Sequence, residues 1–275
     1  MLDTLQARIR QKYRTMSWPD GPPPPLPARF AGRPRVDRTT CDNCGACAAA
    51  CPVGAIACTD GRPALDTGRC LFCRACERAC TRGAVTFTNE FRMAAAQRED
   101  LVVKDTARAA PAPYQPSLEN GRAGPPDPPR AVPSALVEKA RNYFGRSLKL
   151  RQVSAGGCNA CEADTNVLGT VGWDLGRFGI QFVASPRHAD GLLVTGPVTA
   201  NMRLALEKTY AAVPSPKIVI ACGACAIAGG PYIDHPEVGN GAASVVPVDL
   251  FIPGCPPHPL TILDGLLRFV GRITT

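Results

Sequence analysis

The sequence predicts a small α+β domain followed by a larger α/β domain with a doubly wound, mainly parallel sheet. The small domain is indicated by an internal repeat: residues 41–56 and 70–85 align at an offset of 29, with four cysteines matched. The larger domain is indicated by nearly continuous apolar segments that alternate with helical patterns after residue 147, as in a parallel sheet covered on both faces. A chain of 275 residues is long enough to bury both cores.

Composition divides the chain into four segments. They are a basic, proline-rich extension (1–35), the repeat domain (36–105), a linker rich in Pro and Ala (106–133) and the α/β domain (134–275). In the extension we expect a short helix over 4–14 and a stiff polyproline spacer over 21–28. Each half of the repeat should form a cysteine loop, a short helix and a strand, and residues 86–104 should extend their small sheet.

The α/β domain should alternate strands with helices. The expected strands span 148–154, 180–185, 191–196, 217–222 and 244–252. The expected helices span 135–145, 159–171, 200–212 and 258–271. This order of elements predicts a sheet with helices on both faces.

Fourteen cysteines are the most informative feature of the composition. Residues 1–20 contain no apolar run typical of a secretory signal and no twin-arginine signal. We therefore expect a cytoplasmic protein whose thiols stay reduced and bind metal. No apolar stretch reaches the length that spans a bilayer, so membrane contact should come through a partner.

Each half of the repeat carries the spacing C-x2-C-x2-C-x3-C. This spacing lets three thiolates bind one [4Fe-4S] cluster and sends the fourth to a second cluster. By that rule the first cluster is assigned to Cys41, Cys44, Cys47 and Cys80, and the second to Cys51, Cys70, Cys73 and Cys76. Residues 36–90 therefore resemble bacterial two-cluster ferredoxins. Zinc sites are the alternative, but they would normally bring histidine ligands or two separated C-x2-C pairs.

The two motifs depart from the ferredoxin pattern at one position. Pro52 follows Cys51 as that pattern requires, whereas Thr81 follows Cys80. Without the proline ring this turn is less fixed, so ligation should survive while the reduction potential of that cluster can differ. Cys58 stands outside both motifs and is expected to be a small buried apolar residue.

The remaining cysteines predict a third site in the α/β domain. They are Cys158, Cys161, Cys222, Cys225 and Cys255. Each group follows a predicted strand, and the carboxyl ends of parallel strands meet at one edge of the sheet, so these loops should lie together. Four thiolates and glycine-rich loops, with no suitably placed histidine, favour a third [4Fe-4S] cluster over zinc.

Four motifs in the α/β domain resemble those of a known family. They are SAGGCNACE, SPRHADGLLVTGPVTANM, GACAIAGGPY and VPVDLFIPGCPP. Residues 148–272 thereby resemble the small subunit of membrane-bound [NiFe]-hydrogenases of the formate hydrogenlyase and energy-converting type, and the homologous twenty-kilodalton subunit of complex I. The resemblance implies a flavodoxin-like domain in which a cluster next to a catalytic large subunit is bound by Cys158, Cys161, Cys225 and Cys255. Cys222 is then left over, and Gly223 favours Cys225 because it frees the turn.

The spacing of the first two cysteines separates two branches of this family. Complex I subunits usually carry adjacent cysteines here, whereas this chain has Cys158-Asn-Ala-Cys161, as in the hydrogenase branch. The fused ferredoxin domain also suits that branch. A hydrogenase-type complex is therefore favoured over a complex I-like NADH dehydrogenase, in which the homologous twenty-kilodalton subunit takes part in quinone binding. Residues 199–203 open a helix where related subunits approach quinone or the catalytic subunit, although a simple N-cap explains Thr199 equally well.

Glu162 and three histidines are further candidates. Glu162 is either a proton relay at the interface with the large subunit or a first-turn helix residue favoured by the helix dipole. His188, His235 and His258 are isolated in the sequence and are expected to be loop or cap residues.

Together these features predict an electron-transfer subunit with three [4Fe-4S] clusters. Its expected partners are a hydrogenase large subunit or its complex I counterpart, the forty-nine-kilodalton-like subunit, together with antiporter-like membrane subunits and a soluble electron donor or acceptor protein. It should lie peripherally on the inner face of the cytoplasmic membrane. The opposing interpretation is a zinc-dependent nucleic-acid-binding protein, suggested by the net charge of +8. Three clusters of about −2 each would lower that charge to about +2, which argues against nucleic acid as a partner.

Overall fold

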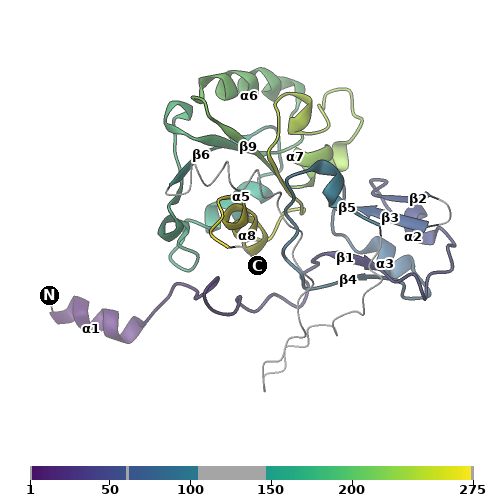
Figure 1. The fold of residues 1–275 in the computed structure, drawn as a ribbon, viewed down its shortest axis with the longest axis horizontal. Coiled ribbons are helices and arrows are strands. Elements are labelled where there is room, and N and C mark those ends of the chain that lie inside the picture. The colour runs from purple at the N-terminus through teal and green to yellow at the C-terminus, as the bar shows by residue number, and fades with distance from the viewer. Residues whose placement is uncertain (1, 60–61, 105–146, 274–275) are drawn as a thin grey trace.

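The computed structural model describes residues 2–59, 62–104 and 147–273 (Figure 1). Its larger domain contains a five-stranded parallel sheet in the order β10-β9-β8-β6-β7. The strands are β6 (Leu148–Ser154), β7 (Ile180–Phe182), β8 (Gly191–Thr195), β9 (Ile218–Cys222) and β10 (Leu250–Ile252). Counted along the chain and read from the β7 edge, this is the flavodoxin-like order 2-1-3-4-5. The predicted doubly wound α/β fold is confirmed.

Helices cover both faces of this sheet (Figure 1). They are α5 (Ala160–Val167) and α8 (Pro259–Phe269) on one face, and α6 (Ala200–Ala212) and α7 (Ala224–Ala228) on the other. Alternate strand residues serve the two cores: Ile220 packs with the apolar side chains of α8, whereas Val219 packs with those of α6 and α7. The helix expected over 135–145 and the linker expected over 106–133 lie outside the described residues.

The last strand is shorter than the sequence predicts. β10 begins at Leu250, whereas Ala242–Ser244 form a 3-10 helix. Pro247 has no amide hydrogen to donate to a strand ladder. The Asp249 carboxylate accepts a hydrogen bond from Val219 N at 2.8 Å. This amide of β9 is therefore bonded to a side chain rather than to a strand carbonyl just before β10 begins. The expectation of one strand over 244–252 is therefore wrong except at its end.

In the smaller domain, each half of the sequence repeat forms a short helix and is followed by a strand. β1 (Pro34–Val36) pairs with β4 (Val85–Phe87), while β3 (Arg62–Asp66) pairs with β2 (Ile56–Thr59) and β5 (Val102–Val103). The short helices are α2 (Ala46–Ala49) and α3 (Ala75–Ala79). Both helices follow a residue in the left-handed region, Gly45 with φ 73° and Arg74 with φ 58°. The predicted small α+β domain and its sheet extension by residues after 86 are confirmed.

Backbone hydrogen bonds join the smaller domain to the edge of the parallel sheet. Ala95 N donates to Phe251 O at 2.9 Å, and Phe251 N donates to Ala95 O at 2.8 Å, which forms an antiparallel bridge beside β10. Near α7, a Cβ atom at Gly68 would lie 2.9 Å from Ile227 Cγ2. The smaller domain therefore contacts β10 and α7, the two elements from which Cys255 and Cys225 are positioned.

The proline-rich extension packs against the larger domain rather than serving only as a spacer. Trp18 is 7% exposed and belongs to the core around α8. Its ring meets Phe91 edge to face, with centroids 6.0 Å apart. Arg177 donates hydrogen bonds to the carbonyl oxygens of Met16 at 2.7 Å and Trp18 at 2.6 Å. The extension thus contributes a side chain to the core around α8, a contact that the polyproline pattern did not predict.

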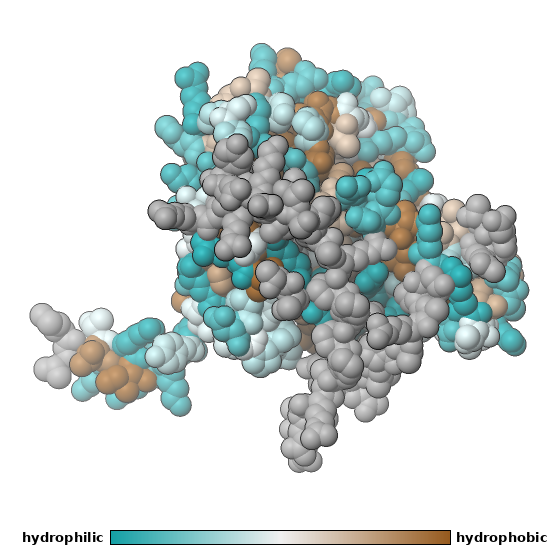
Figure 2. Space-filling model, in the orientation of Figure 1, coloured by the Kyte–Doolittle hydropathy of each residue, from teal (hydrophilic) through white to brown (hydrophobic). Residues whose placement is uncertain are grey.

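α1 (Leu2–Gln11) forms where the sequence predicts a helix over 4–14, and it ends earlier. Leu5 and Ile9 on this helix are 60% and 68% exposed. Figures 1 and 2 show α1 standing apart from both domains, with apolar residues gathered on it. None of the helices in the described ranges has the length and apolar character needed to cross a membrane.

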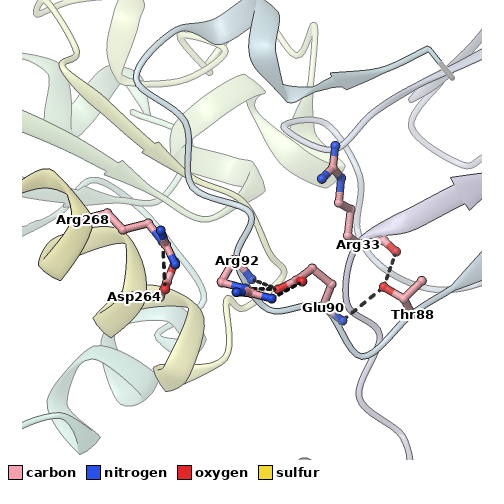
Figure 3. Close-up of polar contacts among 6 residues, drawn as sticks. All are labelled: Arg33, Thr88, Glu90, Arg92, Asp264 and Arg268. Atoms are coloured by element: carbon pink, nitrogen blue, oxygen red, sulfur yellow. Dashed lines mark hydrogen bonds and ion pairs between the residues drawn. The ribbon is translucent and has the colours of Figure 1, made fainter. Parts of the chain in front are cut away.

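A buried ion pair in α8 lies beside residues 90–92 of the smaller domain (Figure 3). Asp264 and Arg268 lie 2.9 Å apart, with side chains 1% and 8% exposed. Glu90 and Arg92 form a second pair at 2.8 Å. Burial raises the pKa of Asp264 to about 6, against the opposing effects of Arg268 and then Arg92. The charge of Arg92 therefore stabilises a carboxylate of the larger domain.

Candidate metal centres

The first cavity brings together the four cysteines assigned to the first cluster. Its wall is formed in part by Cys41, Cys44, Cys47 and Cys80. Ala84 N donates a hydrogen bond to Cys80 Sγ at 3.2 Å. Cys58 lines the same cavity and is exposed, so the expectation that Cys58 is a buried apolar residue is wrong. The physical reason is its place on β2, an edge strand whose residue 58 faces this cavity rather than the core.

The second cavity is the counterpart of the first in the other half of the repeat. Its cysteines are Cys51, Cys70, Cys73 and Cys76. Ala55 N donates to Cys51 Sγ at 3.2 Å, which repeats the hydrogen bond seen in the first cavity. Burial raises the pKa of Cys70 to about 12 and that of Cys76 to about 11. These thiols would therefore release their protons when a metal group stabilises the thiolates.

Three loops at the carboxyl ends of the sheet bring four further cysteines together. Cys158 and Cys161 follow β6, Cys225 follows β9, and Cys255 follows β10. Burial raises the pKa of Cys225 to about 12, and the thiols of Cys255 and then Cys158 add to this rise. Burial also raises the pKa of Cys161, with further contributions from Cys222 and Cys225. Ala224 N donates a hydrogen bond to Gly254 O at 2.8 Å, and Gly223 faces Cys161 Sγ, so the segments that carry Cys161, Cys225 and Cys255 lie side by side.

Glycines make room for two of these sulfurs. A Cβ atom at Gly223 would lie 2.5 Å from Cys161 Sγ, and one at Gly230 would lie 2.6 Å from Cys225 Sγ. Both glycines have positive φ, 95° and 58°, which side chains rarely adopt. Cys222, at the end of β9, is fully buried in the core, whereas Cys225 is partly exposed beside the other thiols. The structure thus places Cys225 beside the other thiols of the third site and Cys222 in the core.

The second and third sites adjoin each other. Burial raises the pKa of Cys255, and the thiols of Cys158 and then Cys73 raise it further. Cys73 lines the second cavity, and Gly68, two residues before Cys70 of that cavity, faces Ile227, two residues after Cys225 of the third site. The bridge between Ala95 and Phe251 supports this arrangement because the Cys255 loop follows directly from β10.

The three donor sets fit [4Fe-4S] clusters. Four thiolates are the usual ligands of such a cluster, and amide groups near the sulfurs can tune it. Across residues 2–59, 62–104 and 147–273, no three Cys, His, Asp or Glu side chains converge closely enough to hold one metal ion. The cysteines instead line wider cavities in the smaller domain. A bound cluster would supply one-electron transfer at each site.

Glu162 lies directly behind Cys161 in the first turn of α5 and is 6% exposed. Its Oε1 atom accepts hydrogen bonds from Ser154 Oγ at 2.5 Å and from Thr195 Oγ1 at 2.7 Å. Burial raises the pKa of Glu162, but hydrogen bonds from Ser154, Thr195 and the backbone together outweigh burial and lower it. Glu162 is thus held as a carboxylate against β6 and β8, and its place in the first turn also suits the helix dipole.

The histidines act as loop and cap residues, as expected. His258 caps α8 and accepts a hydrogen bond at Nδ1 from the amide two residues ahead, at 3.1 Å. His235 makes the same kind of contact at 3.2 Å, and His188 ends a short 3-10 helix. Thr199 stands at the N-cap of α6, as expected, although its side chain makes no cap hydrogen bond. Its side chain instead faces Gly156, where a Cβ atom would lie 2.5 Å from Thr199 Cγ2.

Comparison with known proteins identifies both parts of the chain. Residues 158–269 match the family described as NADH ubiquinone oxidoreductase, 20 Kd subunit. Residues 34–57, which hold the first half of the repeat, match the 4Fe-4S binding domain. The first match therefore begins and ends around the third site, from Cys158 to beyond Cys255.

Curated relatives agree with this assignment. The chain is 43% identical over 131 residues to the probable membrane-bound hydrogenase subunit mbhJ of Pyrococcus furiosus, which covers 48% of this chain and 78% of that protein. It is 44% identical over 143 residues to formate hydrogenlyase subunit 7 of Escherichia coli, covering 52% and 54%. It is 42% identical over 118 residues to an NADH-quinone oxidoreductase subunit of Clostridium beijerinckii, covering 42% and 70%. The chain therefore belongs to the family that unites this NADH-ubiquinone oxidoreductase subunit with subunits of membrane-bound hydrogenases, and it carries a 4Fe-4S binding domain in the same polypeptide.

Proposed function

We propose that the chain is the electron-transfer subunit of a membrane-associated [NiFe]-hydrogenase-type complex and passes electrons through three [4Fe-4S] clusters. The observation that carries this proposal is the contact between the two domains beside the cysteines: Gly68, two residues before Cys70, faces Ile227, two residues after Cys225. Four assigned cysteines line each of the two cavities, and four further cysteines lie in the loops that follow β6, β9 and β10. The chain itself forms no bond with a substrate. Its role is to fix the distances and potentials of the clusters.

The two cavities of the smaller domain support one order of transfer. Cys51 lies in the first half of the repeat but lines the second cavity, and Cys80 lies in the second half but lines the first. The two cavities are therefore neighbours within one small domain. Since the segment before Cys70 of the second cavity faces α7, which carries Cys225 of the third site, electrons would pass from the first cavity to the second and then to the third site.

The hydrogenase branch is supported by the spacing of Cys158 and Cys161, with two residues between them. The expected partners are a hydrogenase large subunit next to the third site, antiporter-like membrane subunits that hold the chain peripherally at the cytoplasmic face, and a soluble electron carrier. A quinone-reducing complex I-like assembly is the second candidate, favoured by the 42% identity to an NADH-quinone oxidoreductase subunit. In that case the forty-nine-kilodalton-like subunit of such an assembly would take the place of the hydrogenase large subunit. Hydrogen turnover by the isolated complex supports the first candidate, whereas quinone reduction without hydrogen turnover supports the second.

Metal analysis tests the iron–sulfur assignment directly. The chain, purified without oxygen, is expected to contain about twelve irons and about twelve acid-labile sulfides. Stoichiometric zinc without sulfide, together with salt-sensitive binding to DNA or RNA, would contradict the proposal and support the zinc alternative. About eight irons would support the ferredoxin domain and contradict the third site.

Glu162 is proposed as a proton relay beside the third site. Glu162→Gln keeps the size of the side chain and an oxygen that can accept from Ser154 and Thr195, but it cannot carry a proton as a carboxyl group. We expect hydrogen turnover of the complex to fall about 100-fold, while the iron content and the reduction of the clusters by dithionite stay as in the unaltered protein. Unchanged turnover would limit Glu162 to positioning the start of α5.

A further inference from the structure

The first cavity contains five cysteines, one more than a [4Fe-4S] cluster binds. Cys58 lines this cavity together with the four assigned ligands. Its side chain is exposed, whereas Cys47 is buried. Cys47 lies on α2, which contacts β2, the strand that carries Cys58, and both cysteines line the same cavity. An additional thiol therefore lies beside a proposed ligand.

The internal repeat shows that this position faces the cluster cavity in both halves of the domain. At the offset of 29, Cys58 on β2 corresponds to Phe87 on β4. Phe87 lines the second cavity just as Cys58 lines the first. The Phe87 ring packs there against Phe72, with centroids 6.2 Å apart. The two cavities thus share one architecture, but the first has a sulfur donor where the second has an aromatic ring.

The strand that carries Cys58 is able to adjust. β2 is the edge strand of its sheet and pairs with β3 alone within the described residues. Asp66 N donates a hydrogen bond to Ala55 O at 2.8 Å, and because bonded pairs alternate along an antiparallel ladder, Cys58 and Pro63 form a pair without backbone hydrogen bonds. A small shift of this strand is therefore less costly than a shift of a central strand.

We propose that Cys58 is a reserve ligand of the first cluster that can take the place of Cys47. This rests on the proposed iron–sulfur function. In the exchange, the iron–sulfur bond to Cys47 breaks and one to Cys58 forms, while the oxidation state of the cluster stays the same. The Cys58 thiol gives up its proton on binding, and the released Cys47 thiolate takes one up. The second cavity has no such exchange because Phe87 offers no donor atom.

Alanine variants of the full chain, purified without oxygen, test this inference by iron and sulfide content and by EPR of the clusters. Cys47→Ala is expected to keep about twelve irons, with a changed EPR spectrum for the first cluster because its ligand has moved. Cys47→Ala/Cys58→Ala is expected to fall to about eleven irons with the signal of a three-iron cluster, or to about eight where the cluster is lost. Equal iron content in the single and double variants would overturn the proposal.

The second cavity provides the matched control. Cys76→Ala, the counterpart of Cys47→Ala, is expected to lose iron because Phe87 cannot replace the missing thiolate. Cys76→Ala/Phe87→Cys is expected to regain about twelve irons. If Cys76→Ala alone kept about twelve irons, retention would need no reserve thiol and the inference on Cys58 would fail. Absence of iron and sulfide from the unaltered chain would instead contradict the proposed function itself.

Discussion

Cys225→Ala is expected to remove the third cluster, about four of about twelve irons, whereas Cys222→Ala is expected to leave the iron content unchanged. The two cysteines lie three positions apart, at opposite ends of one turn between β9 and α7. Cys225 is partly exposed beside Cys158 and Cys255, while Cys222 is fully buried in the core. Loss of one thiolate from a set of four leaves an iron without its protein ligand, and Cys222 is held in the core by its place in β9, between β8 and β10.

Electron transfer separates the two variants further. In Cys225→Ala, dithionite should still reduce the two clusters of the smaller domain, but turnover by the complex should fall at least about 100-fold because the last step to the large subunit is missing. Cys222→Ala serves as the control for folding, since it removes a buried sulfur of similar position and costs on the order of 1 kcal/mol of stability. Loss of iron in Cys222→Ala with retention in Cys225→Ala would reverse the ligand assignment.

The general architecture was readable from the sequence because each feature has a local signal. The apolar strands and the repeat offset follow from residue patterns that survive in any chain of this fold. The meeting of the Cys158, Cys225 and Cys255 loops follows from one rule, since all three come after parallel strands whose carboxyl ends share an edge.

Contacts between distant segments were not readable in this way. The bridge between Ala95 and Phe251 has no signal in either sequence segment, because any two residues can exchange backbone hydrogen bonds. The contact of Trp18 with Phe91 likewise depends on how the extension packs against the core around α8. Cys58 was misjudged because a cysteine outside a motif is usually buried, although its alignment with Phe87 pointed to the cavity.

Arg268→Met is expected to destabilise the larger domain by about 3–5 kcal/mol at pH 8, since it leaves a buried carboxylate without its main partner. Asp264 is 1% exposed, and both of its oxygens accept hydrogen bonds from Arg268 Nε, at 3.0 and 2.9 Å. Arg92 lowers the pKa of Asp264 less than Arg268 does, so it cannot compensate fully. Urea unfolding followed by circular dichroism measures the change.

The pH dependence of this variant follows from the direction of the pKa shift. Burial already raises the pKa of Asp264 to about 6, so ionisation of Asp264 costs stability in the folded state. Without Arg268 the pKa rises further, because the charge that favours the ionised form is gone. Protonated Asp264 is tolerated in the folded state, so its contribution to stability is present at low pH and is lost as pH rises through the folded pKa. Relative to the unaltered protein, Arg268→Met should therefore lose less stability at pH 6 than at pH 8.

A second variant separates the unpaired charge from the loss of packing. Asp264→Leu/Arg268→Met replaces the pair by apolar side chains and is expected to recover most of the lost stability, since apolar replacements of buried ion pairs are often neutral or stabilising. It should also lose the difference between pH 6 and pH 8, because the titrating carboxyl group is absent. If the double variant were as unstable as Arg268→Met at both pH values, packing of the arginine stem in α8, rather than the buried charge of Asp264, would account for the loss.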